Sequence, residues 1–322
     1  MRTMVLNRID VKNLLNMPDV ISVVENAFRE WSQGKGSMPA KAYLVVEKGD
    51  FRAMPAALPG AAGMKWVNVH PKNPSRNLPS VMAILIYNDV ETGYPLAIMD
   101  ATEITAYRTA ATAAIASKYL ARKGSNSLGI IGAGRQAYTQ ILAHAEIFNL
   151  KLIKVFDTSK AATDKLIEDL PEYSLKECSL EETMDSDIIC TLTPSRVPLI
   201  RREWIVAGTH INAVGADAEG KEELEPSILK EAIVVVDDLR QAVHAGEINV
   251  PISKGVFSDD EIYATLGEII VGNKQGRMDD KVITIFDSTG VAIEDIAVAK
   301  LIFEKAQKQG GYLSVDFVVG QE

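Results

Sequence analysis

The chain has 322 residues, of which 47% are apolar and 24% charged, so it is long enough for two domains and can bury a sizeable core. Its net charge of -9, without a basic stripe, argues against a nucleic-acid partner. Two cysteines are too few for a disulfide framework, and no stretch approaches the roughly 18 apolar residues of a membrane span, so we expect a cytoplasmic protein without a metal or a membrane partner.

The first hundred residues are expected to form a helix and then a sheet. Between Val20 and Trp31, apolar residues recur at the spacing of a one-sided helix, which Gly34 and Gly36 end. Strand-like runs then follow one another at residues 41–49, 51–56, 62–69, 80–88 and 94–100. Because no helix lies between these runs, they predict an antiparallel sheet. An alanine-rich helix over residues 102–122 comes next.

Beyond that helix, strands alternate with helices, which is typical of a parallel, doubly wound sheet. The expected strands are residues 128–131, 153–157, 187–193, 209–216, 233–238 and 282–288, and the expected helices include residues 135–148, 160–170 and 228–232. A last helix over residues 291–309 leads to a strand at 312–319 that could return to the first domain. We therefore predict an α/β protein in which a doubly wound domain, residues 125–299, is inserted into a discontinuous α+β domain, residues 1–124 plus 300–322.

The turn after the first alternating strand carries a G-x-G-x-x-A pattern formed by Gly132, Gly134 and Ala137. The first glycine permits the tight turn, the second lets the backbone approach a pyrophosphate, and the helix N-terminus favours the anion. Asp157 ends the next strand, where a carboxylate accepts hydrogen bonds from the adenosine ribose and repels a 2′-phosphate. The pattern predicts NAD rather than NADP. Packing glycines and a helix-capping aspartate stay open as alternatives, and Lys160 lies close enough in sequence to favour NADP.

Further candidates follow other strands of the alternating region. Thr191, Thr193 and Ser195 come at the carboxyl end of a strand, where a doubly wound sheet presents its ligand, although turn chemistry alone also explains Ser195. Asp217 follows a strand and a glycine turn. Its carboxylate could orient an amine or hold a water, or it could simply stabilise the turn.

Four cations of the first domain stand in apolar surroundings: Lys41, Arg52, Lys65 and Arg108. A charge in such a setting requires an anion, which can be a side chain or a ligand. For any one of them, an ion-paired or snorkelling side chain is an equal alternative. As a set, beside a dinucleotide-binding domain, they favour an anionic substrate. Neither a histidine-containing metal motif nor a nucleophile elbow is present in the sequence.

Several motifs together resemble the ornithine cyclodeaminase and mu-crystallin family, which includes an archaeal type of alanine dehydrogenase. They are MKWVNVHPKN, LPSVMA, TGYPLAIMDATEITAYRTAATAAIA, IGAGRQA, INAVGADAEGKEEL, GEI and FDSTGVAIED, and they run through essentially the whole chain. The resemblance implies a Rossmann domain inserted into a domain that binds the substrate and builds the interface of a homodimer. The implied partners are NAD and a small amino acid, or the corresponding keto or imino acid, in the cleft between the domains.

The resemblance also implies roles for single residues. Lys65 and Asp217 match the catalytic groups of the family, and Lys41 and Arg108 match the cations that hold the substrate carboxylate. The expected cofactor neighbours are Thr109, Gly132, Gly134, Arg135, Gln136, Ala137, Asp157, Thr191, Thr193, Ser195, Val214, Lys221 and Ser288.

Arg52 separates the activities within the family. Bacterial-type ornithine cyclodeaminases resemble this chain but carry a glutamate in ELMP, where this sequence has Arg52 in RAMP. A guanidinium there would repel the second ammonium of ornithine and would instead hold a substrate carboxylate, unless Asp50 or Glu47 pairs with it. We therefore predict an NAD-dependent alanine dehydrogenase. The alternatives are an ornithine cyclodeaminase, with NAD as a recycled cofactor, and a ketimine reductase or mu-crystallin-like binding protein.

Overall fold

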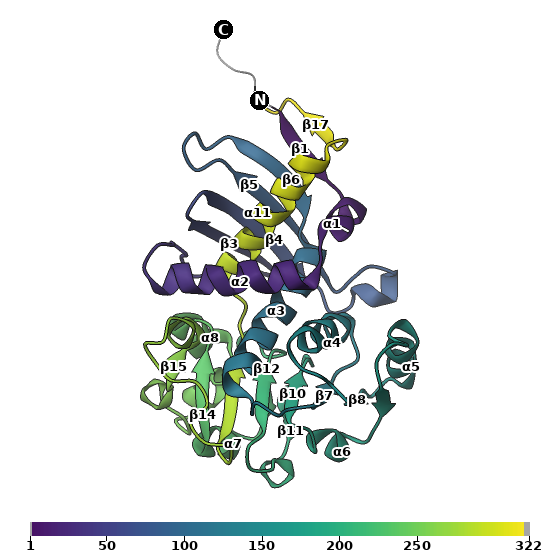
Figure 1. The fold of residues 1–322 in the computed structure, drawn as a ribbon, viewed down its shortest axis with the longest axis vertical. Helices are drawn as coiled ribbons and strands as arrows, with labels where there is room; N and C mark the ends of the chain where they lie inside the picture. The colour runs from purple at the N-terminus through teal and green to yellow at the C-terminus, as the bar shows by residue number, and fades with distance from the viewer. Residues whose placement is uncertain (1, 319–322) are drawn as a thin grey trace. The chain divides into compact units, whose positions relative to one another are not determined.

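A computed structural model describes residues 2–318, which form two compact units (Figure 1). Unit 1 comprises Met1–Arg108 with Val291–Glu322, and unit 2 comprises Thr109–Gly290. The chain passes from one unit to the other inside helix α3 (Thr102–Leu120) and returns just before helix α11 (Ala292–Gln309). The boundaries expected from the sequence, after residues 124 and 299, lie further along the chain, because the pattern changes only where α3 ends although α3 has residues in both units.

Unit 1 is built on a seven-stranded sheet in the order β17-β1-β6-β5-β4-β3-β2. Its strands are β1 (Thr3–Leu6), β2 (Ala42–Val46), β3 (Gly49–Leu58), β4 (Ala61–Val69), β5 (Val81–Asn88), β6 (Pro95–Asp100) and β17 (Leu313–Val315). The antiparallel meander from β2 to β6 confirms the prediction. The expected C-terminal strand also returns to this unit, because β17 pairs with β1, a strand that the pattern did not predict. Residue 319, the end of that prediction, lies outside the described residues.

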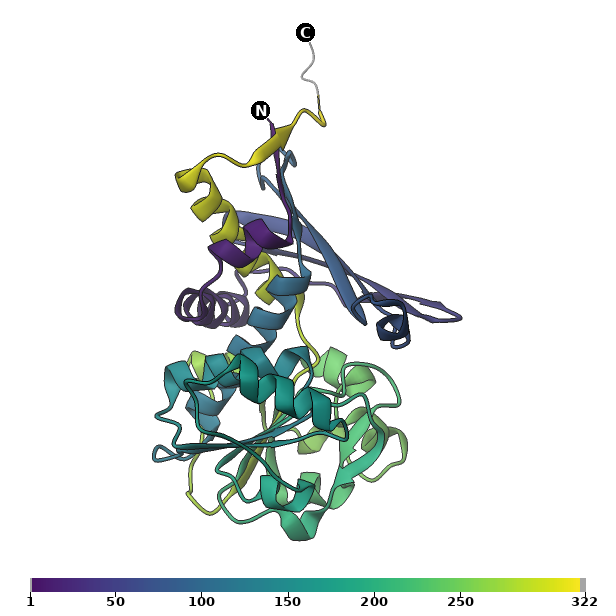
Figure 2. The ribbon, with the colours of Figure 1, turned by 90° about the vertical axis from the view of Figure 1, so that its right-hand side faces the viewer.

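One face of this sheet is buried under helices. Helix α11 packs against β3, β4, β5 and α2 (Met17–Ser32), and Figure 2 shows both helices on the same side of the sheet. Helix α2 begins at Asn16, whose side chain accepts a hydrogen bond from the Asp19 amide, and it buries Val20, as its periodicity predicted. Because strand side chains alternate between faces, the buried face carries Met54 on β3 and also Lys65 on β4. The short helix α1 (Arg8–Leu14) precedes α2.

Unit 2 contains an eight-stranded, parallel sheet in the order β15-β14-β16-β12-β10-β7-β8-β9, which confirms the doubly wound prediction. Its strands are β7 (Ser127–Ile131), β8 (Leu152–Phe156), β9 (Leu175–Glu177), β10 (Ile188–Thr191), β12 (His210–Ala213), β14 (Ala232–Val236), β15 (Ala264–Thr265) and β16 (Ile283–Asp287). Strands β11 (Arg196–Ile200) and β13 (Glu222–Leu224) form a separate pair.

Helices lie on both faces of this sheet (Figures 1 and 2). They are α4 (Arg135–Ile147), α5 (Lys160–Asp169), α6 (Leu180–Met184), α7 (Pro226–Glu231), α8 (Leu239–Ala245), α9 (Asn249–Ser253) and α10 (Leu266–Ile270). Alternate residues of β7 enter two different cores: Ile130 packs in one cluster with Ala137 of α4, and Ile131 packs in the other with Ile211. Strand β7 is therefore apolar on both sides, as a central strand of a covered parallel sheet requires. Short 3-10 helices lie at Asn73–Arg76, Arg202–Trp204 and Asp259–Glu261.

Candidate active site

The glycine pattern forms the turn between β7 and α4, and its three small residues meet three different needs. Gly132 has φ +102°, a conformation that favours glycine, and a Cβ on it would lie 3.1 Å from the carbonyl oxygen of Leu192. Gly134 is the N-cap of α4, and a Cβ on it would meet no other atom within 4 Å. Ala137 is fully buried beneath the helix. Only Gly134 therefore leaves its backbone open to an approaching ligand.

Asp157 lies beside this turn, directly after β8. Its Oδ2 accepts a hydrogen bond from the Ala133 amide and its Oδ1 accepts one from the Ser159 amide, each at 2.7 Å. Lys160, which could have favoured NADP, is instead paired with Glu177 at 2.9 Å and Asp164 at 3.0 Å. The hydrogen bonds that Lys160 donates to Glu177 and, second, to Asp164 raise the pKa of Lys160 to about 12. The carboxylate of Asp157 is thus bound directly to the backbone of the glycine turn, at Ala133.

The carboxyl ends of β10 and β12 are tied together by Glu223, a fully buried residue of β13 that we did not predict. Its carboxylate accepts hydrogen bonds from the hydroxyls of Thr191 and Thr193, at 2.7 Å each, and from the amides of Thr193 and Gly215, at 2.8 and 3.0 Å. Burial raises the pKa of Glu223, and the hydrogen bonds from Thr191 and Thr193 oppose that shift. The hydroxyls of Thr191 and Thr193 therefore donate their hydrogen bonds to Glu223 in this structure. The only sequence signal for Glu223 was its place in the motif GKEEL.

Other predicted cofactor neighbours of unit 2 lie on the same strands and turns. Ser288 is buried after β16 and its amide donates to the carbonyl of Ala213, while the amide of Val214 donates to the carbonyl of Thr191. The hydroxyl of Ser195 donates to the carbonyl of Val197 at 2.6 Å. In addition, Arg135 is exposed in the first turn of α4, Gln136 is half-buried beside it, and Thr109 is buried in α3.

Asp217 and Lys221, which were predicted in separate roles, form an ion pair with each other. The Lys221 Nζ lies 2.5 Å from the Asp217 Oδ1 and 3.3 Å from the carbonyl oxygen of Gly215. The Asp217 side chain is about one-third exposed. The turn that carries Asp217 begins at Gly215, whose amide donates to Glu223. A carboxylate thus stands at this turn with a lysine as its counter-ion.

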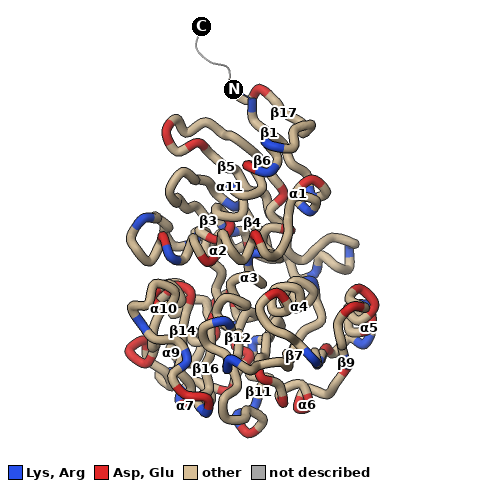
Figure 3. The backbone as a smooth tube through the Cα atoms, viewed as in Figure 1, with Lys and Arg blue, Asp and Glu red and all other residues tan. Residues whose placement is uncertain are grey.

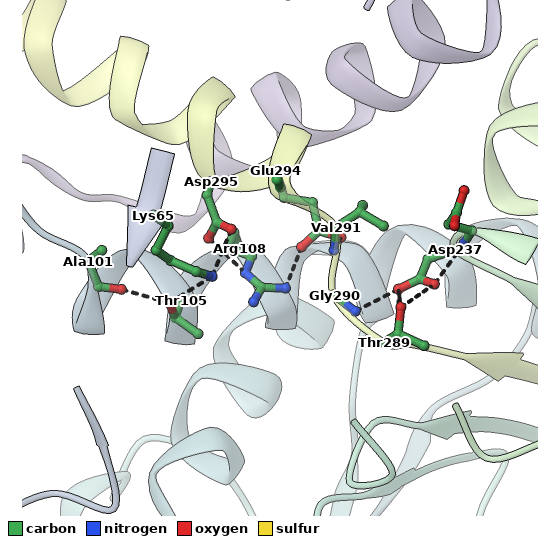
Figure 4. A network of polar contacts seen from close by, with 12 residues as sticks. Lys65, Ala101, Thr105, Arg108, Asp237, Thr289, Gly290, Val291, Glu294 and Asp295 are labelled. Atoms are coloured by element: carbon green, nitrogen blue, oxygen red, sulfur yellow. Dashed lines mark hydrogen bonds and ion pairs between the residues drawn. The ribbon is translucent and has the colours of Figure 1, made fainter. Parts of the chain in front are cut away.

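In unit 1, the structure brings Lys65 and Arg108 to one carboxylate, that of Asp295 (Figure 4). The Lys65 Nζ lies 2.7 Å from Asp295 Oδ2 and 3.4 Å from the hydroxyl of Thr105. The Arg108 Nε donates to Asp295 Oδ1 at 3.1 Å, and its Nη1 donates to Glu294 Oε2 at 2.6 Å. Both carboxylates belong to the first turn of α11 and are fully buried.

Glu294 and Asp295 were not among the site residues predicted from the sequence. Two adjacent carboxylates in the otherwise apolar run VAIEDIAVA were the available signal. Burial first, and then the charges of Arg108 and Lys41, lower the pKa of Lys65, whereas Asp295 opposes these effects, and the resulting pKa is about 7. Lys65 can therefore exchange a proton near neutral pH.

The other two predicted cations differ from this pair. Arg52 is 4% exposed, and its Nε donates to Asp50 Oδ1 at 2.7 Å while its guanidinium lies 5.3 Å from the centre of the Tyr43 ring. Asp50, one of the two internal partners considered for Arg52, therefore pairs with it in the structure. Lys41 is half-buried just before β2, and its charge acts on Lys65.

Residues 2–318 contain no cluster of His, Cys, Asp and Glu that could hold a metal ion. Among the same residues, no helix has both the length and the apolar character needed to cross a bilayer. Figure 3 shows lysine and arginine interspersed with aspartate and glutamate in both units. The cytoplasmic location stays a prediction.

A doubly wound sheet with a glycine turn after its first strand and an aspartate after the next strand is typical of dinucleotide-binding proteins. The model of the ornithine cyclodeaminase/mu-crystallin family matches residues 1–310, and the chain belongs to this family. It is 50% identical over 308 residues to the alanine dehydrogenase of Archaeoglobus fulgidus, covering 95% of this chain and 96% of that protein.

Two solved structures are also similar. An archaeal alanine dehydrogenase dimer with bound NAD has a TM-score of 0.97 and 49% identity, covering 99% of this chain and 100% of that one. The Δ1-pyrroline-2-carboxylate reductase of Thermococcus litoralis, in complex with NADH and L-proline, has a TM-score of 0.95 and 39% identity, covering 97% of this chain and 100% of that one.

Proposed function

We propose that this chain is an NAD-dependent alanine dehydrogenase, which converts L-alanine to pyruvate and ammonia and catalyses the reverse reductive amination. The observation that carries the proposal is its 50% identity, over nearly its whole length, to an alanine dehydrogenase. Arg52 in place of the glutamate of cyclodeaminases also supports a substrate without a second ammonium.

The residues of unit 2 fit NAD. The N-terminus of α4 has no side-chain cap, and Gly134 leaves its backbone open, so the helix can receive a pyrophosphate. Asp157 is placed to bind the ribose hydroxyls and to disfavour a 2′-phosphate, since Lys160 is paired elsewhere. NAD, when bound, supplies the acceptor for the α-hydride of the amino acid.

The other residues have proposed roles in holding the substrate and moving protons. Arg108, with Lys41 or Arg52, holds the carboxylate of alanine. Lys65 assists proton transfer, for which a pKa of about 7 is suitable. Asp217 orients the amine or the water that attacks the imino acid. We assign NAD to unit 2, and the substrate and the dimer interface to unit 1, in place of the predicted division into residues 125–299 and residues 1–124 plus 300–322, because Glu294 and Asp295 contact Arg108 within unit 1.

A homodimer is part of the proposal. The similar archaeal alanine dehydrogenase is a dimer. The sheet of unit 1 has one face without covering helices in Figure 2, and Trp66 and Ile84, which are cross-strand neighbours on that face, are 40% and 56% exposed. Large exposed apolar residues on adjacent strands favour an interface with a second copy.

The experiment is a comparison of substrates with the purified protein. NADH absorbance should rise when L-alanine and NAD are mixed with it, and should fall with pyruvate, ammonia and NADH. Proline formed from ornithine at constant NADH would instead identify a cyclodeaminase. Binding of NAD without turnover of any small amino or imino acid would support a crystallin-like binding protein.

A second candidate is an imine reductase that acts on a cyclic substrate. The 39% identity and the TM-score of 0.95 to a Δ1-pyrroline-2-carboxylate reductase favour it. The same assay separates the two functions, because NADH would then be consumed with Δ1-pyrroline-2-carboxylate and not with pyruvate and ammonia.

A further inference from the structure

Two cations from different elements of unit 1 converge on a single carboxylate. Lys65 extends from β4 and Arg108 from α3, and Asp295 of α11 contacts both, with one oxygen for each (Figure 4). The three side chains are almost completely buried. Asp295 therefore fixes the separation between the ammonium and the guanidinium.

This arrangement is a balanced network of charges. Glu294 neutralises Arg108 from the other side, so that two cations face two carboxylates. A buried ammonium without a partner would lose its proton or leave its position, because desolvation penalises the charge. Asp295 and Glu294 lie in the first turn of α11, where the helix dipole also stabilises a negative charge.

We propose that Asp295 is the residue that positions Lys65 for proton transfer and holds it at a defined distance from Arg108. This inference rests on the proposed function, because it gives Lys65 a part in the reaction. Asp295 itself contacts the two cations and acts through them. It is distinct from Glu294, which serves Arg108 and the amide of Val291.

Three charged groups act on the pKa of Lys65, and together they predict how this pKa changes when the charge of Asp295 is removed. They are Arg108 on α3 and Lys41 before β2, which lower the pKa of Lys65, and Asp295 on α11, which raises it. Loss of the Asp295 charge must therefore lower the pKa of Lys65 below its present value of about 7. The limb of the pH–rate profile that reports Lys65 then moves to lower pH, whether Lys65 acts as an acid or as a base.

The test compares Asp295→Asn with Glu294→Gln, two isosteric changes at neighbouring buried carboxylates. In Asp295→Asn, kcat for alanine oxidation should fall by about 10-fold or more, and the Lys65 limb should move to lower pH by about one unit or more. In Glu294→Gln, the main effect should be a higher KM for alanine, through Arg108. Equal shifts of the limb in both variants, or none in Asp295→Asn, would overturn the proposal.

A second variant separates charge from position and covers the case in which Asp295→Asn does not fold. Asp295→Glu keeps the negative charge but moves it by one methylene. The Lys65 limb should stay near that of the wild type while kcat falls by about 10-fold or more. Turnover at the level of the wild type would show that the position of the carboxylate is irrelevant.

The pairing of Lys65 with Asp295 can also be tested without an activity measurement, through the pH dependence of the free energy of unfolding. The pKa of Lys65 is depressed from 10.5 to about 7, so this lysine makes the free energy of unfolding rise with pH between those values. In Asp295→Asn, that rise should begin at lower pH than in the wild type. If the wild type oxidises no alanine, the proposed function fails, and unfolding measurements at several pH values still decide the pairing of Lys65 with Asp295.

Discussion

Arg52 carries the strongest sequence argument about the substrate, and in the structure its charge is met by Asp50 on the same strand. An internal partner does not by itself remove the arginine from the substrate site, because a guanidinium has five donors and can serve two anions. Arg52 can therefore be a purely structural partner of Asp50, or it can also contact the carboxylate of the substrate.

The substitution Arg52→Glu should abolish most alanine oxidation, because a second carboxylate would stand beside Asp50 in a buried place. The double variant Arg52→Met/Asp50→Asn removes both charges of the pair. It therefore separates the structural role of Arg52 from a role in binding the substrate. If Arg52 binds the substrate, KM for alanine in the double variant should rise by about 10-fold, as for a lost charged hydrogen bond. Steady-state kinetics with saturating NAD measure this KM. Unchanged alanine oxidation in Arg52→Glu would remove Arg52 from the substrate site.

Asp157 is the residue from which the choice of cofactor was predicted. In Asp157→Asn, the repulsion of a 2′-phosphate is lost while one side-chain oxygen still accepts a hydrogen bond from the glycine turn. The ratio of kcat/KM for NAD to that for NADP should fall by about 10-fold or more. The matched control is Asp169→Asn, an exposed carboxylate paired with Lys165, which should leave the ratio unchanged. The same fall in both variants would point to a general effect of charge.

At the scale of elements, the turn between β7 and α4 shows why two glycines of one motif are not equivalent. Gly132 is required by its own backbone, since φ is +102° and a side chain would press on Leu192. Gly134 has an ordinary backbone conformation and open space around it. The second glycine is therefore explained only by a ligand.

We accordingly predict opposite effects for two alanine substitutions. Gly132→Ala should lower the free energy of unfolding by about 1 kcal/mol or more, because a residue with a Cβ is strained at positive φ. Gly134→Ala should leave stability within about 0.5 kcal/mol of the wild type but raise the dissociation constant of NAD by about 10-fold or more. Urea unfolding and calorimetric titration with NAD measure the two quantities. NAD binding unchanged in Gly134→Ala would contradict the assigned pyrophosphate site.

Elements also differ in how far they could be predicted. The longer strands of unit 2 and the helices α4, α5 and α7 follow from the sequence pattern, because each apolar run is bounded by turn residues. Strands β1, β9, β11, β13 and β15 were missed, since all of them are short. Strands β9 and β15 are the edge strands of the sheet in unit 2, and β11 and β13 form a separate pair. Glu223 was missed because it lies on the short strand β13. Its carboxylate accepts hydrogen bonds from Thr191 of β10 and from the amide of Gly215, which follows β12.

On the scale of the whole molecule, two buried histidines make stability depend on pH. Burial lowers the pKa of His144 to about 4 and that of His210 to about 3. The native state therefore holds both rings neutral, and their contribution to stability is lost as the pH falls from about 6.5 towards those values.

In His144→Gln, the free energy of unfolding should fall less steeply with decreasing pH than in the wild type, by up to about 1.4 kcal/mol per pH unit between pH 6.5 and 4. The measurement is a series of urea transitions at several pH values in this interval. Since the comparison is a difference between two proteins, the titration of other buried groups such as Asp287 cancels. Parallel curves for the two proteins would show that His144 is not held neutral.

The proposed homodimer is the second prediction at this scale. Ile84→Glu places a charge at the centre of the exposed face of the sheet in unit 1, and it should convert a dimer into a monomer without unfolding it. Light scattering coupled to size-exclusion chromatography gives the mass directly. Val206→Glu, a similar change at an exposed valine of unit 2, should leave the dimer intact. A dimer that persists in Ile84→Glu would exclude this face as the interface.

The sequence by itself determined the longer strands and helices in their chain order, the parallel sheet of unit 2, the glycine turn with Asp157, and the set of unusual cations. These features depend on periodicity and on residues close together in the chain, where local physical chemistry is sufficient. Only the tertiary structure decided which charges meet. Asp295 lies far from Lys65 and Arg108 in the chain, and Glu223 far from Thr191. A buried ion takes its partner from whichever element folds against it, so it leaves no periodic trace in the sequence.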